Sequence, residues 1–320
     1  MESADVLHDV PVLASRFSSW KHPQTAQLYQ YSKDSCDYSL KAVSQHEVVS
    51  HNGEFPACGG LYSSWVYPGG DLEKLKVVAD FYSAWVFIDD LIDNSTDMSQ
   101  VSDLIDSVRV RVIGSRQGNQ GLDFMHRLFT HDGWHPEMLR LVRDEMDLWF
   151  KCTLALREIE AEQRTVSIEE YMTYRQTNAA MGVMYLVMTF AMPEVTEDFL
   201  RLNESSPSVI RSIFSYCGRS MGVVLDLYKL NADHAQICEY SHIAKIVQRN
   251  SSTPLSLEQA VDRSVELFHE YEDSLRAELD KVASFSPKLA HAMESVHAGS
   301  ITWLEVMRGG RYVKKLKSQG

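Results

Sequence analysis

Apolar residues recur every three or four positions along most of the chain, a pattern typical of helices that bury one face. The clearest case is the segment LEKLKVVADFYSAWVFIDDLID at 72–93, which contains no glycine or proline. Asp71 follows a Pro-Gly-Gly break and is the expected N-cap of this helix. Ser256 and Gln259 together predict a capping box before another long helix. The same periodicity predicts further helices at about 100–113, 122–130, 136–159, 168–192, 197–202, 208–231, 237–249, 256–283 and 287–308.

No run of alternating apolar and polar residues is long enough to predict a sheet. The sequence has no internal repeat and no low-complexity linker that would divide it. We therefore expect one all-α domain over residues 1–320, with many helices around a single core. Residues 1–50 are expected to be partly irregular, and residues 309–320 to form a C-terminal tail.

The charge balance limits the classes of partner. Lys and Arg number 31 and Asp and Glu number 44, which gives a net charge of −13. This acidic balance excludes a general nucleic-acid binder, because phosphate contacts of that kind need clustered Lys and Arg. A phosphorylated small substrate stays possible, because Mg²⁺ can bridge an acidic side chain and a phosphate.

Targeting signals and cysteine patterns are not evident. The most apolar stretch, at 181–192, is too short for a membrane span and is expected to be a buried helix. The N-terminus lacks a basic start followed by an apolar core, so we expect no signal peptide. The five cysteines show no CxxC spacing, which argues against a zinc site or a disulfide framework. We therefore expect a cytoplasmic protein.

An acidic cluster, DDLID at 89–93, ends the strongly apolar helix. Asp89 and Asp93 are four residues apart, so they project from one helical face, and two ionised carboxylates there repel each other. A hard divalent cation would relieve that repulsion, and Mg²⁺ typically takes one or two carboxylates plus water and substrate phosphate. The alternative is a solvated acidic turn, although negative charge at a helix C-terminus is unfavourable.

The combination of Tyr67-Pro68, Asp80-Phe81 and FIDDLID at 87–93 resembles the metal-binding region of microbial class I terpene synthases. That resemblance implies a single helical bundle around a central cavity. It implies that an isoprenyl diphosphate is bound through up to three Mg²⁺ ions and ionised, and that the enzyme then steers the carbocation. It also implies that Asp89 is a metal ligand, with Asp90 and Asp93 in support.

A second segment, YMTYRQTNA at 171–179, resembles the part of the same family that holds a diphosphate-sensing arginine. The resemblance implies that Arg175 grips the diphosphate, and the planar guanidinium fork suits phosphate oxygens. Asn178 and Ala179 match positions beside a helix break where the family often has Asp and Gly. The alternative for Arg175 is an ordinary surface ion pair.

A third segment, Arg311-Tyr312, is similar to a pair that folds over the diphosphate in this family, which would make residues 309–320 a lid. A solvated basic tail is equally compatible with the lysines that follow. An Arg-Tyr dipeptide gains meaning only from its position after the other two segments.

The family's second metal motif, (N/D)Dxx(S/T)xx(K/R)(E/D), is only partly present. Its ligands are at the first, fifth and ninth positions, and its best match runs from Leu225 to Asp233. The match implies that Asp233 is the third ligand, and Asp226, beside the first position, is a further candidate. Leu225 and Lys229 replace the first and second ligands, and neither can coordinate a metal ion. We therefore expect fewer than three bound ions.

Two accounts of this departure stay open. In one, the Lys229 ammonium occupies the place of a missing cation, partnered by Asp226 or Asp233 and by the diphosphate. In the other, ionisation chemistry is altered or lost. A second register, Asn231/Ala235/Glu239, also fails at its middle position.

A carbocation needs an apolar pocket that excludes water and offers aromatic faces. Each aromatic residue near these motifs could equally be plain core packing. The candidates for substrate contact are Phe81, Trp85, Phe87, Trp65, Tyr185 and Trp303.

The resemblance implies a carbon–oxygen lyase that ionises an isoprenyl diphosphate with Mg²⁺, then cyclises or quenches the cation and releases diphosphate. Farnesyl diphosphate is the first expectation and geranyl diphosphate the second, from the habits of the family. The alternatives are a fold-retaining protein that binds a prenyl ligand without ionising it, cation capture by an external nucleophile, and a purely structural scaffold. A monomer and a homodimer are both compatible with the sequence.

Overall fold

The computed structural model describes residues 10–43, 59–95, 97–112, 120–230 and 239–311, some of them by backbone alone. In these ranges the chain forms α-helices and one short 3-10 helix, and no strand. The elements are α1 (Thr25–Val43), α2 (Gly59–Val66), α3 (Leu72–Asn94), α4 (Met98–Val112), α5 (Gln120–Thr130), α6 (Pro136–Ala161), α7 (Ile168–Asn178), α8 (Met181–Ala191), η1 (Pro193–Val195), α9 (Thr196–Ser205), α10 (Pro207–Lys229), α11 (Ile243–Asn250), α12 (Leu257–Phe285) and α13 (Pro287–Arg311).

Helix starts follow the sequence signals closely. The Asp71 side chain accepts hydrogen bonds from the backbone N–H groups of Glu73 and Lys74 at the start of α3. Ser256 and Gln259 form the predicted capping box before α12. Such caps satisfy backbone donors that a helix leaves without a partner. Most predicted helices are therefore confirmed to within a few residues.

The predicted continuous helix at 168–192 is wrong, because α7 and α8 are separate. Ala180 lies between them with a φ of 66°, a left-handed conformation that costs an alanine roughly 1–2 kcal/mol. The indole N–H of Trp149 donates to the carbonyl of Asn178, 2.9 Å away, which satisfies an acceptor left at the end of α7. Two helices, α1 and α2, were not predicted at all, and α11 starts later than expected, at Ile243.

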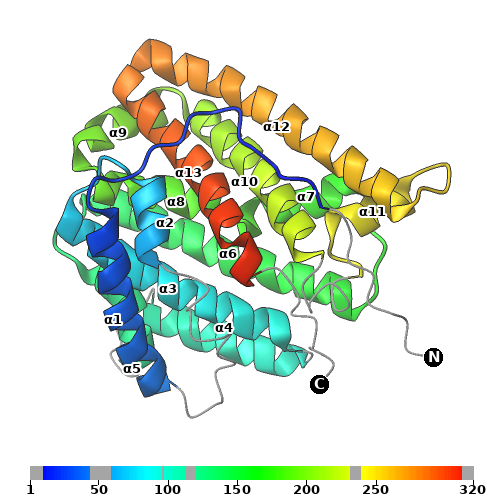
Figure 1. Ribbon diagram of the computed structural model, residues 1–320, viewed down its shortest axis with the longest axis horizontal. Coiled ribbons are helices and arrows are strands. Elements are labelled where there is room, and N and C mark those ends of the chain that lie inside the picture. The colour runs from blue at the N-terminus through cyan, green and yellow to red at the C-terminus, as the bar shows by residue number, and fades with distance from the viewer. Residues whose placement is uncertain (1–9, 44–58, 96, 113–119, 231–238, 312–320) are drawn as a thin grey trace.

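The helices are arranged around α8 and α10. Figure 1 shows α12 along one edge and α3 with α4 along the opposite edge, with α10 and α13 between them. All 11 residues of α8 are buried, as expected for a helix that is apolar on every side. Among the described helices, none is by itself long and apolar enough to cross a membrane. The segments 168–191 and 193–205 reach that length and apolar composition only when taken together, and the chain bends by 104° between them.

Residues 10–24, which we call the N-terminal strap, cross the outer side of α13 and α10 before α1 begins (Figure 1). The backbone N–H of Leu13 donates to the Tyr228 hydroxyl at 3.2 Å. The Ser15 hydroxyl donates to the Glu272 carboxylate at 2.9 Å. The strap is therefore attached to the helical bundle through side chains of α10 and α12.

Glu272 also belongs to a buried polar cluster beneath the strap. Its Oε1 atom lies 2.9 Å from Nε2 of His297, and Nδ1 of the same ring lies 3.2 Å from the Cys217 sulfur. All three side chains are at most 1% exposed. Burial on its own would lower the pKa of His297, but its contacts with Cys217 and Glu272 raise that pKa to about 9.

The raised pKa of His297 predicts a pH-dependent stability. A folded-state pKa above the ordinary 6.5 adds stability that is complete below pH 6.5 and is lost as the pH rises through about 9. We expect the free energy of unfolding to fall over this range at up to about 1.4 kcal/mol per pH unit. Urea unfolding at several pH values measures this slope, and a His297→Gln variant should lack it. An identical slope in both proteins would contradict the prediction.

Candidate active site

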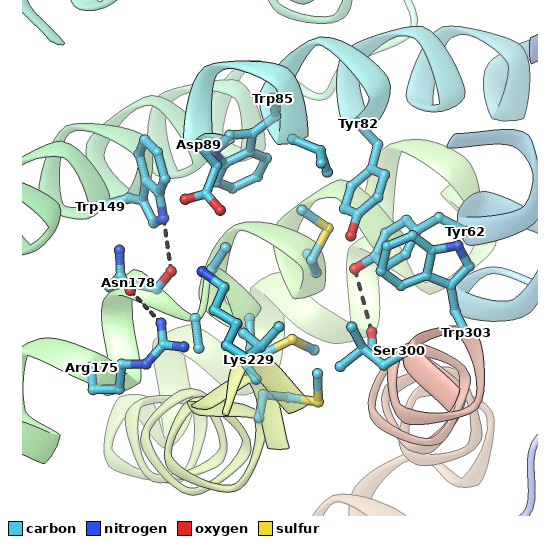
Figure 2. A pocket seen from close by; sticks show the side chains of 18 of the residues that line it. Tyr62, Tyr82, Trp85, Asp89, Trp149, Arg175, Asn178, Lys229, Ser300 and Trp303 are labelled. Atoms are coloured by element: carbon cyan, nitrogen blue, oxygen red, sulfur yellow. Dashed lines mark hydrogen bonds between the residues drawn. The ribbon is translucent and has the colours of Figure 1, made fainter. Parts of the chain in front are cut away.

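One pocket collects most of the residues that the sequence motifs singled out. It opens between α3, α10 and α13 and reaches the break between α7 and α8 (Figure 2). Its lining consists of Tyr62, Tyr82, Trp85, Val86, Asp89, Asp93, Trp149, Arg175, Asn178, Ala179, Ala180, Met181, Met184, Met221, Leu225, Lys229, Ser300, Trp303 and Leu304.

Helix α3 presents one continuous stripe to this pocket. Tyr82, Trp85, Val86, Asp89 and Asp93 line it, and their spacing of three, one, three and four residues keeps them on one side of the helix. The aromatic part comes first, and the two carboxylates lie at the C-terminal end of the helix. The prediction that Asp89 and Asp93 share one face is therefore confirmed.

Helix α10 forms the opposite wall with Met221, Leu225 and Lys229, each four residues after the last. The Lys229 ammonium lies 2.5 Å from Oδ2 of Asp93, and each of the two side chains is about one-fifth exposed. The sequence led us to expect Asp226 or Asp233 as the partner of Lys229. The partner found here is Asp93, because the two helices bring these residues together across the pocket.

The charge of Lys229 is maintained by its surroundings. Burial opposes protonation, but the nearby carboxylates of Asp93 and Asp89 outweigh it and raise the pKa of Lys229 above its ordinary value. Arg175 acts in the opposite direction. The surroundings therefore favour the protonated form of Lys229 at the charged end of the pocket.

Arg175 is buried at the end of α7, so it does not form the surface ion pair considered as an alternative. Its Nε and Nη2 atoms lie 3.0 Å and 2.9 Å from Oδ1 of Asp226, and it also donates to the Asn178 side chain. A Cβ atom at Gly222 would lie 2.8 Å from Cγ of Arg175, so the glycine leaves room for the arginine. Burial opposes its charge, and Asp226 raises the pKa of Arg175 above its ordinary value.

Asp226 does not line the pocket, in contrast to the expectation for a metal ligand. Its side chain is 5% exposed. While Oδ1 binds Arg175, Oδ2 accepts from the Tyr171 hydroxyl at 2.6 Å and from the backbone N–H of Ile243 at 2.9 Å. Both carboxylate oxygens are therefore occupied by donors of the protein, and this geometry favours a role in positioning Arg175.

The break between α7 and α8 brings Asn178 and Ala179 to the pocket wall. The resemblance names these two residues as site candidates, whereas the helical period does not predict the break. The Asn178 amide donates to the Thr153 hydroxyl at 2.9 Å while its oxygen accepts from Arg175. Helix α7 ends at Asn178, and the left-handed Ala180 stands directly before α8 at this wall.

Aromatic rings form the other end of the pocket. The rings of Tyr62 and Tyr82 stack with centroids 3.5 Å apart, and Trp303 meets both edge-on at 5.2 Å and 5.3 Å. Figure 2 shows the Tyr62 and Ser300 oxygens directed toward each other, and they are 3.3 Å apart. Trp85 and Trp303 were predicted here, whereas Tyr62, Tyr82 and Trp149 were not.

Three predicted aromatic residues lie outside the lining of this pocket. Phe81 packs edge-on against Phe129, because it precedes Tyr82 and so points about 100° away from the pocket stripe. The Tyr185 ring stacks on a phenylalanine of α10, with centroids 5.5 Å apart. Trp65 lies beneath the ammonium group of Lys21 at 5.3 Å.

Several predicted site residues fall outside the described part of the chain. Tyr312 and Asp233 lie there entirely, and so do Asn231 and Ala235 of the second register. Glu239 of that register forms ion pairs with two basic residues of α11, and it does not line the pocket. The backbone is described but the side chain is not for Phe87, Asp90 and Arg311.

The charged end of the pocket suits a divalent metal ion that is shared with a ligand. Within the described ranges, no group of three or more His, Cys, Asp or Glu side chains is arranged to hold an ion. Asp89 and Asp93 nevertheless provide the one or two carboxylates that Mg²⁺ typically takes, with water and phosphate oxygens completing its shell. The residues therefore fit an ion that binds together with an anionic substrate.

A protein-family model described as "Terpene synthase family 2, C-terminal metal binding" matches residues 80–274 of this sequence. The match covers more than half of the 320-residue chain. This range includes the acidic cluster, the arginine segment and all of α10. A comparison with curated proteins finds no match.

Solved structures with the same fold include three terpene synthases. Hedycaryol synthase in complex with nerolidol is 13% identical, with a TM-score of 0.71 over 93% of this chain and 99% of that chain. Linalool/nerolidol synthase from Streptomyces clavuligerus in complex with 2-fluorogeranyl diphosphate is 14% identical, with a TM-score of 0.71 over 94% and 99%. Germacradien-4-ol synthase from Streptomyces citricolor is 16% identical, with a TM-score of 0.68 over 92% and 99%. The predicted all-α fold is therefore confirmed.

Proposed function

The chain belongs to terpene synthase family 2, and we propose that it binds an isoprenyl diphosphate with Mg²⁺ in the described pocket, ionises it and releases diphosphate. One observation supports this most strongly. A single pocket has two carboxylates of α3 facing two cationic side chains at one end, and stacked aromatic rings at the other. A diphosphate with a long apolar tail has the same division of charge along its length.

The charged end would act on the leaving group. Arg175 is held by Asp226 and Asn178, so its guanidinium is already oriented when a diphosphate arrives. Together with Lys229, it would offset the negative charge that develops as the carbon–oxygen bond breaks. A Mg²⁺ ion on Asp89 and Asp93, when bound, supplies further neutralisation of the diphosphate oxygens.

The aromatic end would receive the hydrocarbon chain. Tyr62, Tyr82 and Trp303 present ring faces and edges to one space, and ring faces attract a nearby positive charge. Their packing also excludes water from the reacting carbon, so that water does not react with the carbocation too early. The proposal covers both cyclisation of the cation and its capture by water or another nucleophile.

Farnesyl diphosphate is the substrate we propose first, with geranyl diphosphate second. The test measures diphosphate release from C10, C15 and C20 substrates with Mg²⁺, and identifies the hydrocarbon or alcohol products. We expect the C15 substrate to react fastest and each release of diphosphate to be matched by product. EDTA should stop the reaction.

A second candidate function is binding of a prenyl ligand without ionisation, and Leu225 and Lys229 favour it because they replace two expected metal ligands. This candidate predicts saturable binding of an isoprenyl diphosphate with no release of diphosphate. The same assay, combined with a binding measurement, therefore separates the two functions. Absence of both binding and release for all three substrates would contradict both.

A further inference from the structure

The charged end of the pocket contains an ion pair that joins two helices across the site. Lys229 of α10 reaches Asp93 of α3 at 2.5 Å, and the two residues are 136 positions apart in the sequence. Figure 2 shows the Lys229 side chain extending from α10 toward Asp89, with Arg175 beside it. The residues that would bind a metal ion and the diphosphate are thus in contact with each other.

The lining at this end carries charges of both signs. The lining residues whose side chains are described include two carboxylates, on Asp89 and Asp93, and two cations, on Arg175 and Lys229. A third carboxylate, Asp226, pairs with Arg175 behind the lining. Leu225 stands one helical turn before Lys229 and has no atom that can bind a metal ion. The α10 wall can therefore bind an anion but offers no metal ligand of its own.

Either ligand alone would separate Asp93 from Lys229. A diphosphate that takes the Lys229 ammonium removes the lysine partner of Asp93, and a metal ion that takes Asp93 removes the carboxylate partner of Lys229. Separating one member of a partly buried ion pair is costly unless a new partner replaces it. When both ligands bind, the pair is exchanged for two new pairs, lysine with phosphate and aspartate with metal.

We propose that the Asp93–Lys229 ion pair is a latch that couples metal binding to diphosphate binding in this chain. Lys229 then pairs with Asp93 until a diphosphate binds, and afterwards it binds the diphosphate. Its positive charge takes the place of a metal ion that the α10 wall has no ligand to hold. The proposal rests on the proposed function for the identity of its ligands. Because coupling between two ligands is reciprocal, each must raise the affinity for the other by the same factor.

The test uses Mn²⁺ and inorganic pyrophosphate, with no isoprenoid present. Electron paramagnetic resonance measures free and bound Mn²⁺, and calorimetry measures pyrophosphate binding, with the complex that the two form in solution taken into account. In the unmodified protein we expect each ligand to bind weakly alone and to tighten the other by at least tenfold.

Two variants each remove one member of the Asp93–Lys229 ion pair. In Lys229→Met, Mn²⁺ alone should bind several-fold more tightly than in the unmodified protein, because Asp93 has lost its lysine. In Asp93→Asn, pyrophosphate alone should bind several-fold more tightly, because Lys229 has lost its carboxylate partner. In both variants the coupling factor should fall clearly below that of the unmodified protein, to the part supplied by direct contact between Mn²⁺ and pyrophosphate oxygens.

The matched control is Lys151→Met, which removes a 63% exposed lysine paired with Asp147 on α6. It should leave both affinities and the coupling unchanged. Unchanged Mn²⁺ affinity in Lys229→Met together with unchanged pyrophosphate affinity in Asp93→Asn would overturn the latch, and so would the absence of coupling in the unmodified protein. Because no substrate is turned over, failure of the proposed function would show separately, as a lack of diphosphate release.

Discussion

Replacing Asp89 with asparagine is expected to reduce diphosphate release from an isoprenyl diphosphate by at least about a hundredfold. The physical reason is the position of this carboxylate on the pocket stripe of α3, one helical turn before Asp93 and facing the ammonium of Lys229. Asparagine keeps the size of the side chain but loses its charge, so it binds a divalent cation poorly. Steady-state diphosphate release at saturating Mg²⁺ measures the effect.

The control for Asp89→Asn is Asp103→Asn, which makes the same chemical change at an exposed position of the next helix, α4. It should retain full activity. Circular dichroism should give nearly the same melting temperature for the unmodified protein and both variants, because neither side chain is part of the buried core. A fully active Asp89→Asn protein with unchanged Mn²⁺ binding would show that the metal site lies elsewhere.

The α3 side of the site could be predicted from the sequence because the spacing of residues along a helix determines which side chains project from the same face. Trp85 is four residues before Asp89 and Tyr82 is seven residues before it, and both line the pocket. Steps of three or four residues alone do not separate Tyr82 from Phe81, because each is within one turn of Trp85. The rotation from Asp89 does, since it is about 20° for Tyr82 and about 80° for Phe81.

Other features depend on which helices meet, and spacing along one helix does not provide that information. Lys229 has Asp226 as a neighbour in sequence, yet its partner is Asp93 on another helix. Trp149 reaches the pocket from α6 for the same reason. The left-handed conformation of Ala180 was likewise unpredictable, because an alanine gives no local reason for it.

Helix α2 begins with two glycines, Gly59 and Gly60, although glycine has a low helix propensity. A Cβ atom at Gly60 would lie 2.0 Å from the carbonyl oxygen of Leu28, and one at Gly59 would lie 2.0 Å from that of Ala79. These glycines allow α1, α2 and α3 to approach closely, and that requirement comes from packing rather than from local helix propensity.

The largest effect on stability is expected at Asp226, where asparagine should lower the free energy of unfolding by about 3–5 kcal/mol. Oδ1 of Asp226 accepts a hydrogen bond from the Arg175 guanidinium. Oδ2 accepts one from the Tyr171 hydroxyl and one from the Ile243 backbone N–H. An asparagine amide has one acceptor oxygen and one donor nitrogen. Either orientation therefore places an N–H group against another donor, the guanidinium in one case and the Ile243 amide in the other.

A double variant separates this role of Asp226 from metal binding. Arg175→Met removes the guanidinium, so in Arg175→Met/Asp226→Asn the amide can turn its oxygen toward Tyr171 and Ile243 without opposing a cation. We expect the double variant to be clearly more stable than the sum of the two single losses predicts, by urea unfolding of all four proteins. Diphosphate release should stay low in every variant, because Arg175 is either absent or no longer held in place. Mn²⁺ affinity measured without pyrophosphate should not change in Asp226→Asn, provided that the measurement is made where the variant is folded. A large loss of Mn²⁺ affinity there, with additive stabilities, would instead identify Asp226 as a metal ligand.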